Sequence, residues 1–576
     1  MGAGDESACE IITMARLLPG TVVIENRPSW ALAHSDACYG SDQGRCLCFY
    51  GQMYNQAELE AEWQLPVGSS NCAELMIKML DRYGPQQALE KVNGPFALTY
   101  FDGAQVLLAR DHFGIMQLYY SVQNGHLLFS TRLKAMTTGY RGFSKNISPQ
   151  ALNAYFKFNF IPADMCIYDN VHKLPAGRYL RQDSRAQTQG SFFSPVEASL
   201  SSQTLQAGDG ELASEFAGYL RQAVQRRFAE QEKVNLLLSG GVDSALVAAI
   251  LSERGGLSSL TIGFDEKGFS EIEEAALIAA RLGIEHNSHV LSGGQAAELV
   301  PELGGIYEEP YADQSQLATL LAFKMARPVS THLWLGDGGD ELYIGYKRQL
   351  QHARYALDFH PASGRLLFSS FKKAPLNAAQ AFAGLSYKGN YLERLITNPD
   401  YRKVVLKPQE PGPRVDAKIF AIADPYKRAA AFDMIYFLAD GTLVKGGQLA
   451  QALSMRTCLP LLDVELFKFS QRLPLHLLVH DNMGKIILRK VLEKYLPREW
   501  INRPKKGFQP PVGHWLQREL APWAKDMLDD GTIRRQGLLN LKMVRYYWDT
   551  LPRKGSSTNR LWAILMLQSW LLNNGF

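Results

Sequence analysis

The chain has 576 residues, too many for one ordinary hydrophobic core, and at about 150 residues per domain roughly two to four domains are expected. Its composition, with 46% hydrophobic, 11% aromatic and 20% charged residues, excludes wholesale disorder and collagen-like or coiled-coil structure. The 61 basic and 57 acidic residues leave a net charge of +4, too small a field to hold a polyanion, so we expect no nucleic-acid partner.

The two ends of the chain indicate a cytoplasmic protein. The first ten residues, MGAGDESACE, are acidic where a signal peptide would be basic and then apolar. The longest apolar stretch, Leu561 to Leu572, is about twelve residues long and too short to span a bilayer. We therefore expect a buried C-terminal helix and no membrane segment.

The cysteines are expected to be reduced thiols. Seven cysteines are few for this length and odd in number, which argues against the disulfide framework of a secreted protein. The sequence holds no CxxC pair, so neither a zinc–thiolate site nor a dithiol redox centre is expected. The residues are Cys9, Cys38, Cys46, Cys48, Cys72, Cys166 and Cys458.

Residues 1–183 are predicted to form a domain built on antiparallel sheet. Short strand-like segments alternate with turns in LCFYGQMYN, GPFALTYFDGAQVLLARD and GIMQLYYSVQNGHLLFSTRL. Gly103 in FDG and Gly125 in QNG can adopt the positive φ that a tight hairpin turn needs. Residues 184–209, which are rich in Ser, Gln, Ala and Gly and lack periodicity, are predicted to be a linker.

Residues 210–576 change character and predict a parallel sheet. The continuous apolar run at 234–238 suits a strand that is buried on both faces. Further strands are predicted at 259–264, 286–291 and 331–336, and helices at 211–230, 245–251, 270–282 and 318–326. Strands that alternate with helices of this length imply crossover connections, and beyond residue 346 the chain is predicted to be mostly helical.

The segment SGGVDS carries the clearest chemical signal. It lies between a buried strand and a helix, where glycines let phosphate oxygens approach the backbone and the helix N-terminus favours negative charge. The hydroxyl groups of Ser239 and Ser244 can donate hydrogen bonds to phosphate oxygens, and Asp243 is placed to hold a magnesium ion that bridges phosphates. The segment is neither a Walker loop nor a GxGxxG loop. It resembles the pyrophosphate-binding loop of ATP pyrophosphatases, which split ATP into AMP and pyrophosphate.

A second acidic loop, GDGGDELY, follows a later predicted strand. Loops that leave the carboxyl ends of parallel strands converge on one crevice. Asp340 can therefore meet Asp243 around a shared magnesium ion, which commonly takes one or two carboxylates together with substrate phosphates.

These loops belong to an ordered set of motifs that resembles the synthetase domain of the glutamine-dependent asparagine synthetase family. The motifs are SGGVDS, EEPYADQS, GDGGDELYIGY, LPLLD, KIILRK and RPKKGFQPPVGHWL, spread over residues 210–576. The resemblance implies an α/β fold: an N-terminal-nucleophile αββα sandwich, then a parallel-sheet ATP-pyrophosphatase domain with a helical C-terminal part. It also implies ATP and Mg²⁺, and a homodimer is a family expectation.

Roles for individual residues follow from the same resemblance. It implies magnesium binding by Asp243 and Asp340, neutralisation of phosphate charge by Lys505, and a place for Asp337 near the reacting carboxylate. The residues implied to bind ATP are Leu238, Ser239, Gly240, Gly241, Asp243, Ser244 and Gly336.

The first half resembles the glutaminase domain of that family but has lost its chemistry. Gly2 stands where the family has its nucleophilic cysteine, and Cys9 becomes N-terminal only if eight residues are removed. The family's NGE triplet is Tyr50-Gly51-Gln52 here, its aspartate in DxE falls on Cys72 with Glu74 retained, and its arginine falls near Ser35 or Asp36, after His34. We expect an inactive, structural glutaminase domain.

The acceptor side has also changed. Where the family carries an acid, a glutamate and an arginine, this chain has Gly447, Arg456 and Cys458. Because an unpaired buried charge costs about 3–5 kcal/mol, such changes alter which substrate is accepted, so aspartate is doubtful as the natural substrate.

The leading hypothesis is an AMP-forming ligase that joins a small-molecule or peptide carboxylate to an amine, as in β-lactam synthetases and lasso-peptide cyclases, whose glutaminase domains are also inactive. Asp337 argues against the β-lactam branch, which carries a tyrosine there. The alternatives are an asparagine synthetase that uses ammonia and a non-catalytic scaffold. Transfer to tRNA is a weaker hypothesis because the cysteine pairs that it usually needs are missing.

Overall fold

The computed structural model describes a set of ranges that together hold the larger part of the chain. These ranges are 13–18, 21–25, 37–42, 44–66, 68, 70–123, 126–140, 142–183, 185–228, 233–266, 268–358, 391, 395, 397–409, 415–503, 509–552 and 557–576. Several residues named above lie outside them, namely Gly2, Cys9, His34, Ser35, Asp36, Gly125 and Lys505.

Strands dominate the first part of the chain. They are β1 (Thr13–Leu18), β2 (Thr21–Glu25), β3 (Ala37–Asp42), β4 (Arg45–Gly51), β5 (Phe96–Phe101), β6 (Val106–Arg110), β7 (Tyr119–Gln123), β8 (His126–Ser130), β9 (His172–Lys173), β10 (Arg178–Gln182) and β11 (Gln187–Ser191). The helices among them are α1 (Gln56–Glu62), α2 (Cys72–Glu90), α3 (Leu133–Gly139), α4 (Pro149–Phe158) and α5 (Pro195–Ser201).

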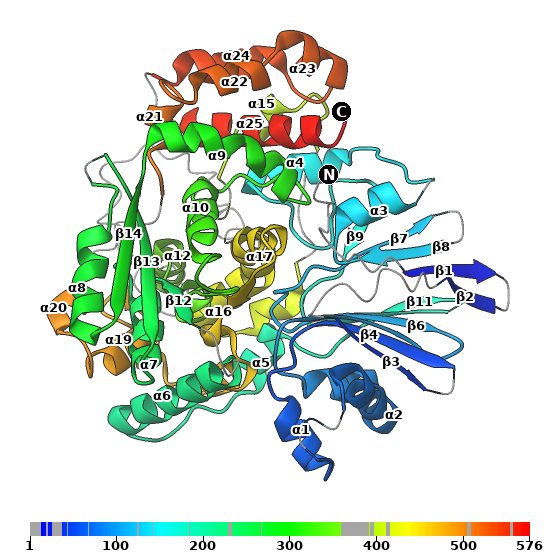
Figure 1. Ribbon diagram of the computed structural model, residues 1–576, viewed down its shortest axis with the longest axis vertical. Coiled ribbons are helices and arrows are strands. Elements are labelled where there is room, and N and C mark those ends of the chain that lie inside the picture. The colour runs from blue at the N-terminus through cyan, green and yellow to red at the C-terminus, as the bar shows by residue number, and fades with distance from the viewer. Residues whose placement is uncertain are drawn as a thin grey trace.

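These strands form two antiparallel sheets that face each other, with helices on the outer faces (Figure 1). One sheet has the order β2-β1-β8-β7-β9 and the other has the order β11-β10-β6-β5-β4-β3. Apolar side chains such as Leu108, Leu127 and Phe129 fill the space between the sheets. The predicted αββα sandwich is confirmed, and Gly103 turns the β5–β6 hairpin at φ +98°.

The predicted linker is wrong for much of its length. Residues 187–191 form β11, which pairs with β10 at the edge of the sheet, and Ser194 caps α5 by accepting a hydrogen bond from the backbone N–H of Glu197. Polar residues suit an edge strand with one solvated face, so composition alone did not separate this strand from a loop.

The prediction that all cysteines are reduced thiols is also wrong. Cys38 on β3 and Cys72 at the start of α2 form a disulfide, with their Cα atoms 6.1 Å apart, a separation that suits such a bond. The two residues are 34 positions apart, so the pairing follows from the fold and not from a local motif. Among the described residues, Cys46, Cys48, Cys166 and Cys458 are thiols.

The second part of the chain alternates strands and helices and then becomes helical. The strands are β12 (Val234–Leu237), β13 (Leu257–Phe264), β14 (Glu285–Leu291), β15 (His332–Trp334), β16 (Arg456–Cys458), β17 (Val479–His480) and β18 (Met483–Gly484). The helices up to residue 452 are α6 (Asp209–Arg226), α7 (Val242–Ser252), α8 (Ile272–Leu282), α9 (Gly293–Ile306), α10 (Gln316–Ala326), α11 (Gly339–Leu342), α12 (Lys347–Asp358), α15 (Tyr401–Val404), η4 (Ala417–Ala421), α16 (Pro425–Asp433), the π-helix η5 (Met434–Thr442) and α17 (Leu443–Ala452). The later helices are η6 (Pro460–Leu462), α18 (Val464–Gln471), η7 (Leu475–Leu477), α19 (Ile486–Leu492), α20 (Arg498–Ile501), α21 (Val512–Trp515), α22 (Ala521–Met527), α23 (Asp530–Gln536), α24 (Leu541–Thr550) and α25 (Ser557–Asn573).

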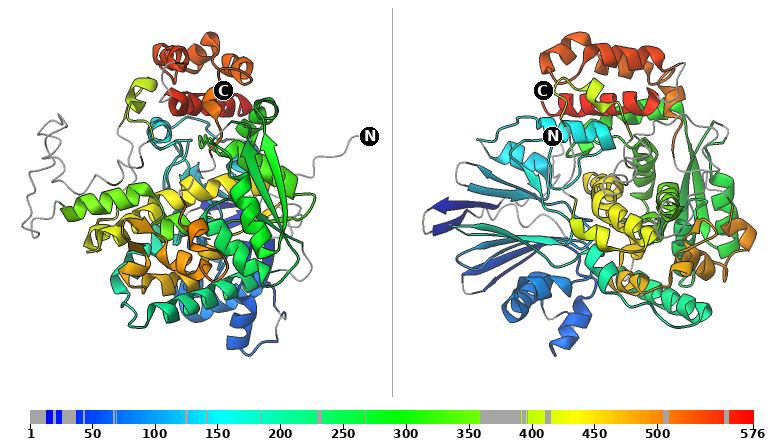
Figure 2. Two further views of the ribbon diagram at one scale, coloured as in Figure 1. Left: turned by 90° about the vertical axis from the view of Figure 1, so that its left-hand side faces the viewer. Right: turned by 180° about the vertical axis from the view of Figure 1, so that it is seen from behind.

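A parallel sheet in the order β14-β13-β12-β15-β16 organises this second part. Helices cover both of its faces, and α21 to α25 gather at one end of the molecule (Figures 1 and 2). The central strand β12 is almost wholly buried, as its continuous apolar run predicts. The predicted parallel sheet and the buried C-terminal helix, here α25, are confirmed.

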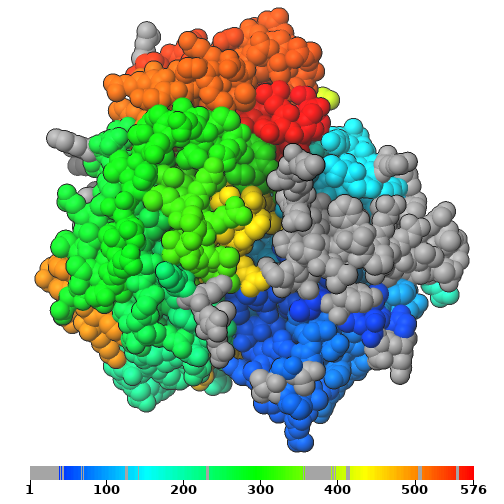
Figure 3. Space-filling model, viewed as in Figure 1, coloured from blue at the N-terminus to red at the C-terminus, as the bar shows by residue number. Residues whose placement is uncertain are grey.

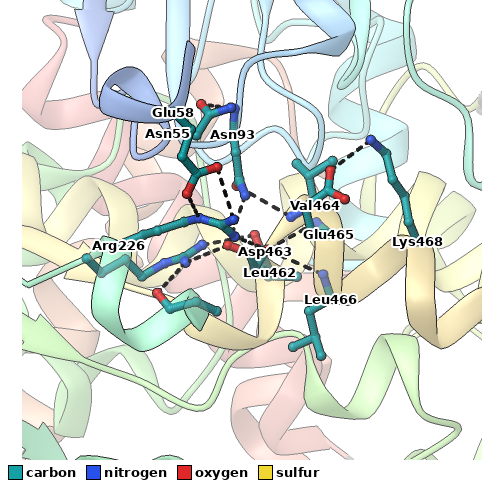
Figure 4. A network of polar contacts seen from close by, with 12 residues as sticks. Asn55, Glu58, Asn93, Arg226, Leu462, Asp463, Val464, Glu465, Leu466 and Lys468 are labelled. Atoms are coloured by element: carbon teal, nitrogen blue, oxygen red, sulfur yellow. Dashed lines mark hydrogen bonds and ion pairs between the residues drawn. The ribbon is translucent and has the colours of Figure 1, made fainter. Parts of the chain in front are cut away.

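A buried polar network joins the two halves of the chain (Figure 4). Asn93, after α2, donates a hydrogen bond from Nδ2 to Oδ2 of Asp463, which also accepts one from Nη1 of Arg227, at 3.0 and 3.1 Å. Nearby, Arg226 pairs with Glu58 at 2.8 Å. Burial opposes ionisation of Asp463, but the two arginines outweigh it and keep the pKa of this carboxyl below its ordinary value.

A second buried set of charges also crosses between the halves. Lys173 on β9 contacts Glu309 at 2.8 Å and Asp440 at 3.7 Å, and these carboxylates come from the second half. Glu308 likewise pairs with Arg132, just before α3. The first two acids of EEPYADQS therefore face the N-terminal sandwich.

Within the described residues, no helix is both long and apolar enough to cross a membrane.

Candidate functional site

The first element of the site is the turn between β12 and α7. Ser244 Oγ accepts a hydrogen bond from the backbone N–H of Ser239 at 3.0 Å and lies 2.9 Å from Ser239 Oγ, so the two hydroxyls close the turn. Leu238, just before it, is buried and donates its backbone N–H to Leu260 O at 2.9 Å. Gly241 precedes α7 without a side-chain cap, a geometry that suits phosphate at the helix N-terminus.

The loop after β15 lies directly against this turn, and glycines allow the approach. A Cβ atom on Gly336 would come within 2.7 Å of the backbone nitrogen of Ser244. One on Gly339 would lie 2.4 Å from Oδ1 of Asp243. Gly338 has φ +93°, a backbone conformation that L side chains rarely adopt. The glycines of GDGGDE are therefore needed for the close contact between the two loops, and the acids between them provide the carboxylates.

Lys485 links the two acidic loops. Its Nζ lies 2.5 Å from Oδ2 of Asp243 and 2.6 Å from Oδ1 of Asp340, and its side chain is only 7% exposed. This lysine is the first residue of the motif KIILRK, to which the sequence alone assigns no role. Lys485 directly precedes α19 and has φ +61°, and a Cβ on Gly345 would lie 2.1 Å from its Cε. The structure thus brings Asp243 and Asp340 to one ammonium group.

The two carboxylates fit a magnesium ion in donor chemistry. Asp243 and Asp340 offer hard oxygen ligands from different loops, and Mg²⁺ usually takes one or two carboxylates together with phosphate oxygens. The ammonium of Lys485 already offsets part of their charge, so a further cation fits best when phosphates are bound as well. Among the described residues, three or more His, Cys, Asp or Glu side chains do not gather anywhere into a group that could hold a metal ion.

Arg503, the last described residue before Lys505, approaches the same turn. Its Nη2 would lie 3.7 Å from a Cβ on Gly240. Arg503 also donates to the backbone carbonyl of Glu274 on α8, at 3.3 Å. The role of Lys505 stays a prediction, because this residue lies outside the described ranges.

Acidic and basic groups also meet on the acceptor side. Asp313 Oδ2 lies 3.3 Å from Lys445 Nζ, and its Oδ1 accepts hydrogen bonds from the backbone N–H and the hydroxyl of Ser315. Burial opposes ionisation, but these partners lower the pKa of Asp313 overall. Burial first, and then the charges of Asp313, Tyr307 and Asp337 in that order, raise the pKa of Tyr311, so Asp337 lies near Asp313 and Tyr311. Its predicted role at the reacting carboxylate stays a prediction.

Glu341 is a buried acid that the sequence analysis did not single out. Burial first, and then the charge of Asp340, raise its pKa to about 7. Thr442 and Tyr346 donate hydrogen bonds to its Oε1 at 2.6 and 2.8 Å and partly oppose this shift. The acidic residue next to Asp340 therefore carries less negative charge near neutral pH than its type suggests.

The positions that correspond to glutamine handling have structural partners here. Gly51, at φ +132°, packs so closely that a Cβ would lie 2.1 Å from Pro95 O. Cys72 is held in the disulfide with Cys38. Glu74 completes a capping box with Asn71 at the start of α2. The retained glutamate thus stabilises a helix end.

Comparisons with known proteins agree with the two-part organisation. The family model for asparagine synthase matches residues 215–572, and that for the glutamine amidotransferase domain matches residues 35–193. A protein of Mycobacterium bovis named a putative asparagine synthetase (glutamine-hydrolyzing) is 28% identical over 553 residues, which covers 91% of this chain and 84% of its own. Asparagine synthetase (glutamine-hydrolyzing) 1 of Bacillus subtilis is 26% identical over 563 residues and covers 92% of this chain and 85% of its own. Among solved structures, the glutamine phosphoribosylpyrophosphate amidotransferase of Bacillus subtilis covers 58% of this chain and 76% of its own, at 10% identity and a TM-score of 0.22.

Proposed function

This chain belongs to the asparagine synthase family and is an ATP-dependent carbon–nitrogen ligase, and on that premise we propose that it joins a substrate carboxylate to an amine without hydrolysing glutamine. The amine belongs to a specialised metabolite or a peptide. The meeting of Asp243, Asp340 and Lys485 beside the SGGVDS turn carries this proposal, because it gathers the charges that a nucleotide triphosphate and its magnesium ion require.

The proposed reaction has two steps. A carboxylate oxygen of the substrate attacks the α-phosphorus of ATP, the bond to the bridging oxygen breaks, and pyrophosphate leaves. The amine nitrogen then attacks the carbonyl carbon, the C–O bond to AMP breaks, and the amine loses a proton to solvent or a nearby base. The products are an amide, AMP and pyrophosphate.

Residues of this chain have distinct parts in these steps. Ser239, Ser244 and the N-terminus of α7 bind the phosphates, with Gly240, Gly241 and Gly336 allowing close approach. Mg²⁺ bound by Asp243 and Asp340 would neutralise phosphate charge. Lys485, joined by Lys505 in our proposal, stabilises the charge that develops on pyrophosphate, and Asp337 acts at the substrate carboxylate.

The glutaminase part of the proposal rests on chemistry that this chain lacks. Gly2 stands where the family has its nucleophilic cysteine, and Cys72, which is held in a disulfide, stands where the family has an aspartate that would bind an amino group. The Gln52 amide replaces a further carboxylate.

A cytoplasmic location and a homodimer stay predictions. The redox state of Cys72 in cells tests the first, and sedimentation of the purified protein tests the second.

A screen of pyrophosphate release over candidate carboxylates tests the proposed function. Each acid is offered with ammonium, with glutamine and with amines, and D243A serves as the inactive blank. D549A, which alters an exposed aspartate on α24, is the matched control and should keep full activity. We expect release that depends on an acid and that glutamine alone does not support. Turnover with glutamine equal to that with ammonium would contradict the inactive glutaminase, and no release with any acid would favour a scaffold.

A second candidate function is an asparagine synthetase that uses ammonia. The 28% identity with the Mycobacterium bovis relative over 91% of this chain favours it, and Gly447, Arg456 and Cys458 argue against it. Pyrophosphate release that depends on aspartate and ammonium would decide for this alternative.

A further inference from the structure

A buried cluster of charged side chains lies where the N-terminal sandwich meets the second half. The sandwich contributes Arg110 and Lys173, and the second half contributes Glu309 and Asp440. These side chains are at most 9% exposed, and their positive and negative charges offset each other. In the space-filling view, yellow atoms from the part of the chain that includes α17 are visible between the green and blue parts (Figure 3). The chain that follows Asp440 thus reaches the surface at this junction.

Lys173 on β9 connects the two acids to the sandwich. Its Nζ lies 2.8 Å from Oε2 of Glu309 and 3.7 Å from Oδ1 of Asp440, and it also donates to the backbone carbonyl of Ile161. Arg110 is farther from Asp440, at 4.0 Å, and each of its guanidinium nitrogens donates to a backbone carbonyl of the sandwich. Burial opposes the charge of Lys173, but Asp440 and Glu309 outweigh it and raise its pKa, so the ammonium form persists.

Asp440 leads from this cluster to the acceptor side of the site. It lies near the end of the π-helix η5, which continues into α17, and π-helical turns are frequent at functional sites. The next residue, Gly441, accepts a hydrogen bond from the hydroxyl of Tyr311 at its carbonyl oxygen, at 2.6 Å. Lys445, in the first turn of α17, contacts Asp313 at 3.3 Å. A displacement of Asp440 would therefore move the helix that carries Lys445.

Glu309 provides a second route to the same place. Its Oε1 accepts a hydrogen bond from the backbone N–H of Ile167 at 2.8 Å, so the sandwich holds both of its carboxylate oxygens. Glu309 shortly precedes Tyr311 and Asp313 in the motif EEPYADQS. The hydrogen bond from Tyr311 to Gly441 ties this segment to η5. The ammonium of one sandwich residue thus contacts both chain segments that form the acceptor side.

We propose that the N-terminal sandwich positions the acceptor side of the ligase, with Lys173 as the positioning residue. Lys173 acts through Asp440 and Glu309, because any displacement of their segments separates opposite charges in a medium of low dielectric. The role in amide formation rests on the proposed function, whereas the hold on the two segments does not. A sandwich that does not hydrolyse glutamine would still be required for the reaction.

The kinetics of K173M test this role. The probes are ammonium and the acid that the screen of pyrophosphate release identifies. We expect the KM for that acid to rise about tenfold, as for residues that share one charged network. The Kd of ATP with Mg²⁺, measured by calorimetry, should change by less than about twofold, because Ser239 and Ser244 close the phosphate-binding turn themselves. An equal weakening of acid and ATP, as in general unfolding, would overturn the positioning role.

Hydrogen exchange measures the hold on the two segments without any substrate. In K173M, the backbone amides of 309–316 and 434–445 should exchange several-fold faster than in the parent protein, because their buried anchor is lost. The amides of α7 should keep the parental rate. Unchanged exchange in both segments would overturn the inference, even if K173M were less active.

The double variant K173M/D440N keeps the test decisive if K173M folds poorly. It removes one charge of each sign, and an asparagine oxygen at position 440 can still accept the N–H of Ala163, as Oδ2 of Asp440 does at 2.7 Å. We expect the double variant to melt at a higher temperature than K173M, because the remaining charges are balanced. It should retain the raised KM and the faster exchange, since the link to the sandwich is absent. A parental KM and parental exchange rates would overturn the role of Lys173.

K418M is the matched control. Lys418 on η4 pairs with Glu197 on α5 at 2.9 Å, and both side chains are more than half exposed, so this surface pair contributes little. K418M should behave like the parent protein, and changes equal to those of K173M would overturn the inference.

The two proposals fail in different ways. Faster exchange in K173M, together with no pyrophosphate release by the parent protein with any acid, would overturn the proposed function alone. Pyrophosphate release by the parent protein, with unchanged KM and unchanged exchange in K173M, would overturn this inference alone.

Discussion

Replacing Lys485 by methionine tests the charge arrangement at the centre of the site. The ammonium contacts two carboxylates at 2.5 and 2.6 Å, and the side chains of Asp243 and Asp340 are only 12% and 17% exposed. Removing one partner of a buried ion pair costs about 3–5 kcal/mol. Because both carboxylates retain some solvent contact, we expect the lower end, about 3 kcal/mol.

Thermal unfolding followed by circular dichroism measures this loss. At roughly 2 °C per kcal/mol, the small end of the range for large domains, K485M should lower the melting temperature by about 6 °C. Added Mg²⁺ should raise the melting temperature of K485M more than that of the parent protein, since a cation can then bind between the two carboxylates. The release of pyrophosphate that depends on the carboxylic acid substrate should fall by about 10²-fold, as it does when one charge-stabilising donor is removed from an active site.

K490M provides a matched control within the same motif. Lys490 pairs with Asp209 at 3.0 Å, and both side chains are more than a third exposed, so this surface pair contributes about 0–1 kcal/mol. We expect K490M to melt within about 2 °C of the parent protein and to keep its activity. If K485M and K490M behave alike in melting temperature, Mg²⁺ response and pyrophosphate release, Lys485 does not join the acidic loops as described.

Three further predictions concern other contacts. D463N should destabilise the protein by about 3–5 kcal/mol at pH 7, because Arg227 is left buried without its partner. Since the pKa of Asp463 is lowered in the folded state, its contribution to stability is present above the unfolded pKa of about 4 and is lost as the pH falls through the folded pKa. Urea unfolding at pH 7 and at a pH below the folded pKa should therefore show that the stability deficit of D463N narrows in acid. A deficit that is equal at the two pH values would contradict the charge argument. G339A should abolish pyrophosphate release because its Cβ would lie 2.4 Å from Oδ1 of Asp243, whereas a fully active G339A would show that the loops tolerate separation. C38S should lower the stability of the N-terminal sandwich by about 4 kcal/mol, the loop-closure value for a separation of 34 residues, and limited proteolysis of the parent protein with and without reductant should show the same loss.

The sequence predicted those parts of the fold whose signals are local. The run at 234–238 and the alternation that follows predicted the parallel sheet, because an apolar run is the requirement for a strand covered on both faces. Helix α9 escaped prediction, although Ser292 and Gln295 form a capping box at its start that the spacing S-x-x-Q can reveal. Strand β11 was missed because its polar residues, QTQGS, resemble a loop in composition.

The site could be predicted only where a motif carries its own meaning. Asp243 and Asp340 follow strands of one sheet, so their approach could be expected from topology. Lys485 lies 242 positions from Asp243 in the chain, in a segment with no local sign of phosphate chemistry. The disulfide of Cys38 depends in the same way on tertiary contact, which an odd number of cysteines does not predict.

The network around Asp463 has a consequence for the evolution of the chain. Asn93 and Arg227 bind one carboxylate from opposite halves, and Arg227 stacks over the ring of Tyr54 at 4.5 Å. Deleting the N-terminal half would leave Asp463 short of a donor and expose Arg227 on the ligase half. Whether or not glutamine is hydrolysed, these contacts therefore favour keeping the two-part architecture, and an engineered chimera must inherit Asn93 and Tyr54 together with the ligase half.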